Sequence, residues 1–186
     1  MTAEVYISVD VETAGPCPSL YSLLSIGACL VTDPQAAFYV ELQPVQLRAA
    51  AGALEVSGLS LEALAETALP PAEAMARFET WALAQTRNGQ RPVFVAFNAP
   101  FDWMFVNDYF HRFLGRNPFG HTALDIKALY MGLTGATWAA TSMQYVAARY
   151  LAGRNLTHHA LSDAQDQAEL LRRMLAEASA QGWSWV

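Results

Sequence analysis

Asp10 and Glu12 lie one residue apart near the N-terminus, after a stretch rich in β-branched side chains. That stretch predicts a strand over residues 5–11. Side chains at positions i and i+2 of a strand point to the same face, so the two carboxylates are expected side by side. Hard cations such as Mg²⁺ prefer oxygen ligands and would relieve the repulsion between the two acids. The pair is therefore either part of a metal site or two solvated acids on an edge strand.

Asp102 follows an apolar run over residues 92–97, which is typical of a buried strand. Residues 101–115 then have the pattern of a helix, so Asp102 falls in the first helical turn. The helix dipole favours a negative charge there, which is sufficient reason for an acid at this position. The end of a strand that leads into a helix is also where open α/β sheets place ligand sites. Phe101, Trp103 and Phe105 are expected to pack in the core.

Asp163 falls in the first turn of a helix predicted over residues 162–180, where apolar side chains recur along one face. His158 stands five residues earlier, too far round to share that face, and is expected in the loop before the helix. From a loop it could reach over a metal site whose acids are held rigidly. A histidine pair such as His158 and His159 is otherwise expected to be exposed to solvent.

Together, the three stretches resemble the motifs of the DEDDh class of 3′–5′ exonucleases, which includes ribonuclease T and oligoribonuclease. The resemblance extends from residue 10 to residue 163. The third motif, His-x-Ala-Leu-x-Asp, fits His158 and not His159, because only His158 stands five residues before Asp163. Motif context of this kind is what supports a catalytic interpretation.

The resemblance implies two divalent metal ions, Mg²⁺ or Mn²⁺, which stabilise the attacking and leaving oxygens. It implies that His158 accepts the proton of the attacking water, as an imidazole can near neutral pH. The product would be a nucleoside 5′-monophosphate released from a 3′ end. The resemblance also implies two sets of site residues. The metal ligands would be Asp10, Glu12, Asp102 and Asp163. The substrate contacts would be Thr13, Asn98 and Phe101.

Other polar residues near the motifs match no motif position. Asp166 is expected to be a surface acid near the start of the last helix, and Asp125 to be structural. Asp108 and His111 are expected to be solvated. Four arginines flank the second and third motifs and could contact phosphates, although helix-surface arginines are usually solvated: Arg112, Arg116, Arg149 and Arg154.

The chain has 186 residues, 53% of them hydrophobic, which suits one domain over residues 1–186. No apolar run is long enough to cross a membrane, and the N-terminus lacks the features of a signal peptide. Cys17 and Cys29 have no metal-binding or redox spacing and are expected to be reduced thiols of a cytoplasmic protein.

The expected order of elements is strands first, then strands and helices in alternation, which predicts an α/β fold with helices packed on a mixed sheet. By resemblance this is the ribonuclease H-like fold with a mixed five-stranded sheet. Strands are expected over residues 5–11, 25–32, 37–43 and 92–97, with a short strand near residue 123. Helices are expected over residues 48–69, 70–87, 101–115, 141–151 and 162–180. The aromatic tail of residues 183–186 could dock on the body or on a partner.

The net charge of −6 limits the substrates. Binding long duplex DNA requires many basic contacts to phosphates. A short RNA or DNA single strand, held at its 3′ end, requires fewer. Selection between RNA and DNA depends on contacts to the 2′-hydroxyl, which no motif reveals. Homodimers are common in the family, although no feature of the sequence points to one.

Two alternatives to a free-standing exonuclease are an accessory proofreading subunit that acts with a polymerase and a non-catalytic nucleic-acid-binding module. No polymerase-binding extension is expected beyond about residue 180, which weakens the first. The five intact motif residues argue against the second.

Overall fold

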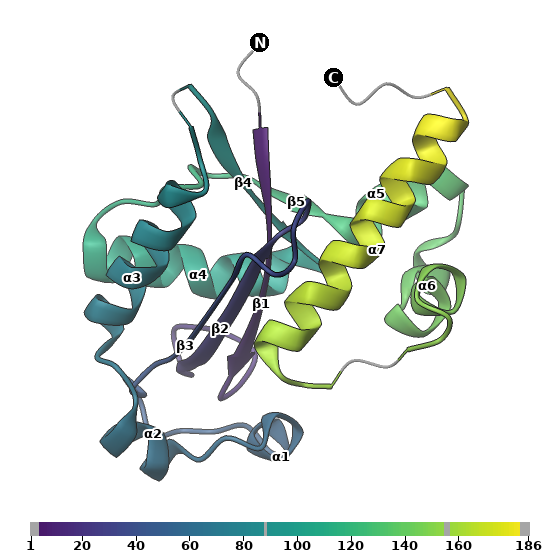
Figure 1. Cartoon of the computed structure of the whole chain (residues 1–186). Coiled ribbons are helices and arrows are strands. Elements are labelled where there is room, and N and C mark those ends of the chain that lie inside the picture. Colours follow the sequence, from purple (N-terminus) through teal and green to yellow (C-terminus); the bar gives the residue numbers. More distant parts are fainter. Residues whose placement is uncertain (1–3, 88, 155–156, 183–186) are drawn as a thin grey trace.

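The computed structural model describes residues 4–87, 89–154 and 157–182, and the 183–186 tail lies outside the described residues (Figure 1). Five strands form a mixed sheet in the order β3-β2-β1-β4-β5. Strands β1, β2 and β3 pair antiparallel, whereas β1–β4 and β4–β5 are parallel. The strand bounds are Glu4–Thr13 for β1, Leu23–Leu30 for β2, Ala37–Glu41 for β3, Arg91–Ala96 for β4 and Ala123–Asp125 for β5. The mixed five-stranded sheet predicted from the sequence is confirmed.

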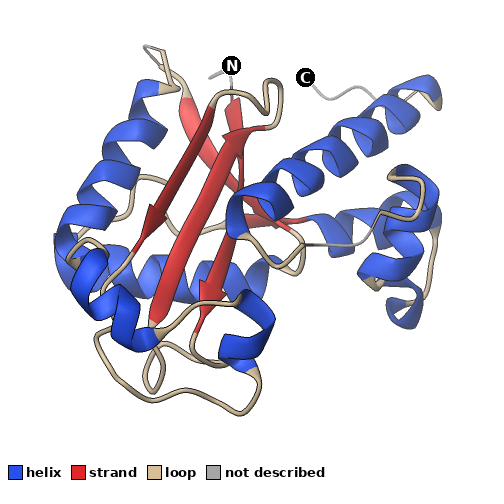
Figure 2. Ribbon diagram, turned by 60° about the horizontal axis from the view of Figure 1, so that its bottom comes forward, coloured by secondary structure: helices blue, strands red, loops and turns tan. Residues whose placement is uncertain are grey.

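Helices cover both sides of the sheet (Figure 2). Helices α3 (Pro71–Ala84) and α4 (Ala99–Leu114) pack against one face, where Ile7, Val9 and Val11 of β1 join the larger core cluster. Helices α5 (Ile126–Thr134), α6 (Met143–Tyr150) and α7 (Ala160–Ala180) form a second core with residues of β2 and β4. The remaining elements are α1 (Ala53–Ser57), α2 (Leu61–Thr67) and the 3₁₀ helix η1 (Trp138–Thr141).

One expectation about helices was wrong, and one helix was not predicted. Residues 48–69 do not form one helix, because Gly58 adopts a left-handed conformation, with φ of 69°, and ends α1 before α2 begins. Helix α5 was not predicted, although Asp125 caps its first turn and Gly135 ends it. In the part of the chain that the structure describes, no helix combines the length and apolar character that crossing a bilayer requires.

Aromatic residues after β4 pack as the sequence predicted. Phe105 is fully buried, and Phe101 and Trp103 are partly buried against the same core. These contacts fix α4 against the sheet, so the start of α4 is held at the carboxyl end of β4.

Candidate active site

The two acids of β1 lie on the sheet face that α7 covers. Val9 and Val11, on the opposite face, are buried in the core beneath α3 and α4, as the alternation predicted. In the register between the antiparallel strands, Asp10 is paired with Gly27 of β2. Helix α7 packs on both β1 and β2, and so lies directly over this pair.

Gly27 allows α7 to come this close. A Cβ atom at position 27 would lie 2.2 Å from the backbone carbon of Ala160 and the backbone nitrogen of Leu161, far inside van der Waals contact. Only glycine lacks that atom. The first turn of α7 therefore rests on the backbone of β2, and this brings Asp163 towards the acids of β1.

Asp10, Glu12 and Asp163 form a cluster in which one carboxylate oxygen from each lies within 4.8 Å of the others. Asp163 is buried, whereas Asp10 and Glu12 are half-buried. An all-oxygen donor set of this kind suits a hard divalent cation such as Mg²⁺ or Mn²⁺ rather than zinc, which favours nitrogen and sulfur. The acidic cluster, as we call these three residues, could therefore hold a metal ion.

Asp102 lies beside the acidic cluster, in the first turn of α4, and is only 4% exposed. Its Oδ1 accepts a hydrogen bond from the backbone N–H of Val11 at 3.2 Å, which ties α4 to β1 between the two acids of that strand. The structure thus brings the four motif acids together from three distant segments, with Asp102 outside the 4.8 Å group.

The pKa values of these acids are raised. Burial, followed by the charges of Asp102, Glu12 and Asp163, raises the pKa of Asp10 well above its ordinary value. Burial and then Asp163 raise the pKa of Glu12 to about 7. Burial raises the pKa of Asp102 to about 8, although hydrogen bonds from backbone N–H groups act in the opposite direction. Crowded carboxylates of this kind hold protons unless a cation replaces them.

Gln167 contacts Asp10, and sequence reasoning missed it. It is 1% exposed and lies one helical turn after Asp163 on α7. Its Nε2 donates to Oδ1 of Asp10 at 2.6 Å, and its Oε1 accepts from the backbone N–H of Phe97 at 2.8 Å. The available signal was its i+4 spacing from Asp163, which places both side chains on one helix face.

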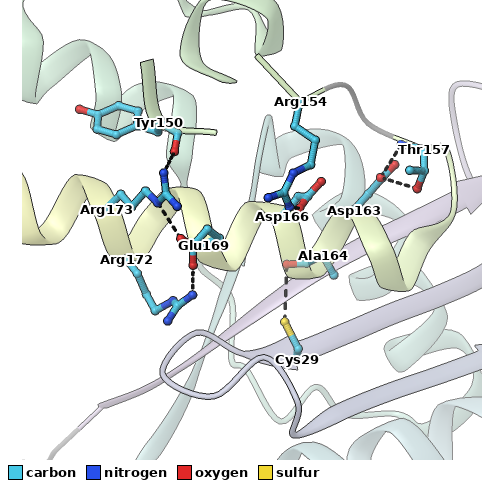
Figure 3. Close-up of polar contacts among 10 residues, drawn as sticks. All are labelled: Cys29, Tyr150, Arg154, Thr157, Asp163, Ala164, Asp166, Glu169, Arg172 and Arg173. Atoms are coloured by element: carbon cyan, nitrogen blue, oxygen red, sulfur yellow. Dashed lines mark hydrogen bonds and ion pairs between the residues drawn. The ribbon is translucent and has the colours of Figure 1, made fainter. Parts of the chain in front are cut away.

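The backbone around His158 is held by Asp163, whose contacts with the neighbouring Thr157 are drawn in Figure 3. Oδ2 of Asp163 accepts from the backbone N–H of His158 at 2.9 Å. Oδ1 accepts from the backbone N–H and the hydroxyl of Thr157, at 2.8 Å and 3.0 Å. His158 is exposed and has a left-handed backbone with φ of 55°, which is uncommon outside glycine and recurs at functional sites. It lies in the loop before α7, as predicted.

His159 has a contact that the sequence did not indicate. Its ring stacks on Tyr39 of β3, with centroids 4.9 Å apart and ring planes inclined by 17°. It is also the residue that precedes the first turn of α7. The side chain of His159 is therefore engaged on β3 and not in the acidic cluster.

The three expected substrate contacts lie around the same end of the sheet. Asn98 is exposed at the start of α4 with φ of 66°, and Phe101 follows it within the first turn. Thr13 ends β1, but its hydroxyl donates to the backbone oxygen of Gly15 at 2.9 Å. Asn98 and Phe101 thus border Asp102, whereas the side chain of Thr13 is engaged in a turn.

Asp166 corrects an expectation. It is not a surface acid but is 8% exposed, and it forms an ion pair with Arg154, drawn in Figure 3. Its carboxylate lies on the side of α7 that Arg154 approaches. Asp125 is structural, as expected: it caps α5 through the N–H of Lys127 and also accepts from the N–H of Asn98 at 3.0 Å.

The comparisons with known proteins agree with this geometry. The family model for the 3′–5′ exoribonuclease Rv2179c-like domain matches residues 5–175. The chain is 46% identical over 169 residues to the 3′–5′ DNA exonuclease Cap18 of Escherichia coli, covering 91% of this chain and 90% of Cap18.

Two solved structures share the fold. The nuclease domain of 3′hExo, a DEDDh family member bound to rAMP, superposes with a TM-score of 0.75 at 15% identity, covering 93% of this chain and 92% of that chain. Exonuclease I of Escherichia coli, in complex with a dT13 oligonucleotide, gives a TM-score of 0.68 at 16% identity, covering 94% of this chain and 41% of that chain. The predicted ribonuclease H-like fold is therefore confirmed. The chain belongs to the 3′–5′ exoribonuclease Rv2179c-like family and is a 3′–5′ exonuclease with the fold of the DEDDh class.

Proposed function

We propose that this protein is a metal-dependent exonuclease that removes nucleoside 5′-monophosphates from the 3′ end of a short single strand. The observation that carries the proposal is the acidic cluster of Asp10, Glu12 and Asp163, whose ligand oxygens lie within 4.8 Å of one another. Two Mg²⁺ or Mn²⁺ ions held there and by Asp102 would supply the charge that stabilises the attacking and leaving oxygens of phosphodiester hydrolysis.

We assign the general base to His158. Support comes from its exposed position and from the hydrogen bond that fixes its backbone to Asp163. A base on this loop would stand beside the acidic cluster and accept the proton of the attacking water. Asn98 and Phe101 are proposed to contact the terminal nucleotides, because both lie in the first turn of α4 beside Asp102. Thr13 is proposed to contribute through its position at the end of β1.

A short substrate is supported by the charge distribution. The four arginines that flank the motifs each form an ion pair within the chain, so their charge is balanced locally: Arg112 with Asp108, Arg116 with Glu79, Arg149 with Glu177 and Arg154 with Asp166. A protein of net charge −6 in which these four arginines are already paired suits a strand bound over a few nucleotides.

We propose DNA as the preferred substrate, because Cap18, a DNA exonuclease, is 46% identical over nearly the whole chain. RNA is the competing substrate, because the family to which the chain belongs is named for an exoribonuclease. The test uses matched 5′-labelled DNA and RNA single strands of several lengths with Mg²⁺ or Mn²⁺.

The expected result is stepwise shortening from the 3′ end, faster on DNA, that stops in excess chelator. A circular single strand, which has no 3′ end, serves as the control and should remain intact. Activity in chelator, or cutting of the circle, would contradict the proposal.

A further inference from the structure

Gln167 is a buried polar side chain in the centre of the protein, 1% exposed, on the face of α7 that also carries Asp163. Burial of an amide is costly unless both its donor and its acceptor find partners. Both groups of the Gln167 amide have partners, because Nε2 donates to the carboxylate of Asp10 and Oε1 accepts from the backbone N–H of Phe97.

The orientation of this amide is fixed by its partners. The N–H of Phe97 can only donate, so it must face the amide oxygen, and the NH₂ group is left for Asp10. Phe97 immediately follows β4 and precedes Asn98, the first residue of the turn into α4. One side chain therefore connects α7, the carboxylate of Asp10 on β1 and the end of β4.

We propose that Gln167 is a positioning residue that holds the Asp10 carboxylate in the orientation needed to bind metal. This inference rests on the proposed function, in which Asp10 is a metal ligand. Among the described residues, Gln167 provides the hydrogen bond that the structure gives to the Asp10 side chain. The acids around Asp10 repel it, so an aimed N–H donor is what keeps one of its oxygens fixed and leaves the other free for an ion.

Metal ligands commonly depend on such partners. Loss of a group that orients a ligand typically lowers metal affinity by about 10–100-fold. Glutamate at position 167 could still accept from Phe97 but could not donate to Asp10 when ionised, and leucine could do neither. The two substitutions therefore separate the contact with Asp10 from the contact with β4.

The test measures Mn²⁺ binding to the metal-free protein by electron paramagnetic resonance, which follows the signal of free Mn²⁺ and needs no substrate. The variants are Gln167→Leu and Gln167→Glu. The matched control is Gln165→Leu on the same helix, because Gln165 is directed away from the acidic cluster and donates to the backbone oxygen of Pro34 at 2.9 Å.

We expect Gln167→Leu and Gln167→Glu to weaken Mn²⁺ binding by about 10–100-fold. Gln165→Leu should bind as the wild type does. In turnover assays at saturating substrate, the two Gln167 variants should need more Mn²⁺ for half-maximal rate, with little change in KM for the oligonucleotide. Circular dichroism in chelator checks that each variant is folded, and if Gln167→Leu is not, Gln167→Glu decides alone.

Wild-type Mn²⁺ affinity in folded Gln167→Glu, or affinity above the wild type, would overturn the inference and leave Gln167 a packing residue. Failure of the proposed function looks different. In that case the wild type itself would not bind Mn²⁺, or would bind it equally well after Asp10→Asn.

Discussion

The backbone N–H of His158 donates to Oδ2 of Asp163 at 2.9 Å, so the acid that completes the acidic cluster also holds the histidine loop. The cluster and the loop are thus one unit, and a change at Asp163 affects both. Asp166, three residues later on α7, is engaged instead with Arg154.

The first prediction compares these two acids. Asp163→Asn should lower the rate of hydrolysis by more than about 100-fold, because an amide lacks the charge that a hard cation needs. This loss is larger than the loss expected when a residue that only orients a metal ligand is replaced. Asp166→Asn should keep most activity and full Mn²⁺ binding, and it should lower the melting temperature slightly, because it weakens the ion pair between a buried carboxylate and the exposed side chain of Arg154. Single-turnover rates, Mn²⁺ titration and thermal melts measure the three quantities. Equal losses of Mn²⁺ binding in both variants would show that Asp163 was wrongly chosen.

The second prediction concerns the two histidines. His158→Ala should lower turnover by roughly 10²–10⁴-fold, the range of general-base catalysis, and leave oligonucleotide binding intact. His159→Ala should have little effect on turnover but should cost about 0.5–1.5 kcal/mol of stability, the worth of an aromatic pair, because its ring stacks on Tyr39. Turnover assays and urea unfolding distinguish the two. A large loss of turnover in His159→Ala, with near-normal turnover in His158→Ala, would show that the general base is His159 and that the third motif was aligned one residue out of register.

The third prediction concerns pH. The pKa values of Glu12 and Asp102 are raised to about 7 and about 8, from ordinary values near 4. At a pH between the ordinary and the raised pKa values, Glu12 and Asp102 hold protons in the folded protein but not in the unfolded chain. The free energy of unfolding of the metal-free protein therefore falls as pH rises through this range. In chelator, the melting temperature should therefore fall between pH 5.5 and pH 8.5, and Mn²⁺ should raise it more at the higher pH. Glu12→Gln should reduce this fall while it abolishes hydrolysis; an unchanged slope would contradict the assignment.

The fourth prediction concerns Gly27. Gly27→Ala places a methyl group 2.2 Å from the backbone of α7, and backbone cannot move aside as a flexible side chain can. We expect a loss of about 1–3 kcal/mol of stability together with weaker Mn²⁺ binding, because α7 carries Asp163. The control is Gly132→Ala in α5, where an added Cβ meets nothing within 4 Å. It should be neutral or stabilise the protein by up to about 1 kcal/mol. Urea unfolding and Mn²⁺ titration measure both variants, and equal behaviour of the two would contradict the steric argument.

The sequence predicted what local patterns determine. The alternation around Asp10 and Glu12 correctly placed Val9 and Val11 in the core, and the apolar run before Asp102 correctly predicted β4. The i+4 relation of Gln167 to Asp163 is visible in the sequence, but its contacts with Asp10 and Phe97 depend on how α7 crosses the sheet. Gly27 is ordinary in sequence, and its role appears only when a helix lies against it. Helix α5 was missed because it is only nine residues long, includes Gly132 and follows the short strand β5 without an intervening loop.

The order of the chain has a consequence for biosynthesis. Asp10 and Glu12 are made early, Asp102 midway, and Asp163 only in α7, the last described helix. Because the N-terminal part of a chain leaves the ribosome first, a nascent polypeptide that has not yet reached Asp163 lacks the third member of the acidic cluster. The metal site that we propose can therefore form only after α7 has been made and has docked on β1 and β2.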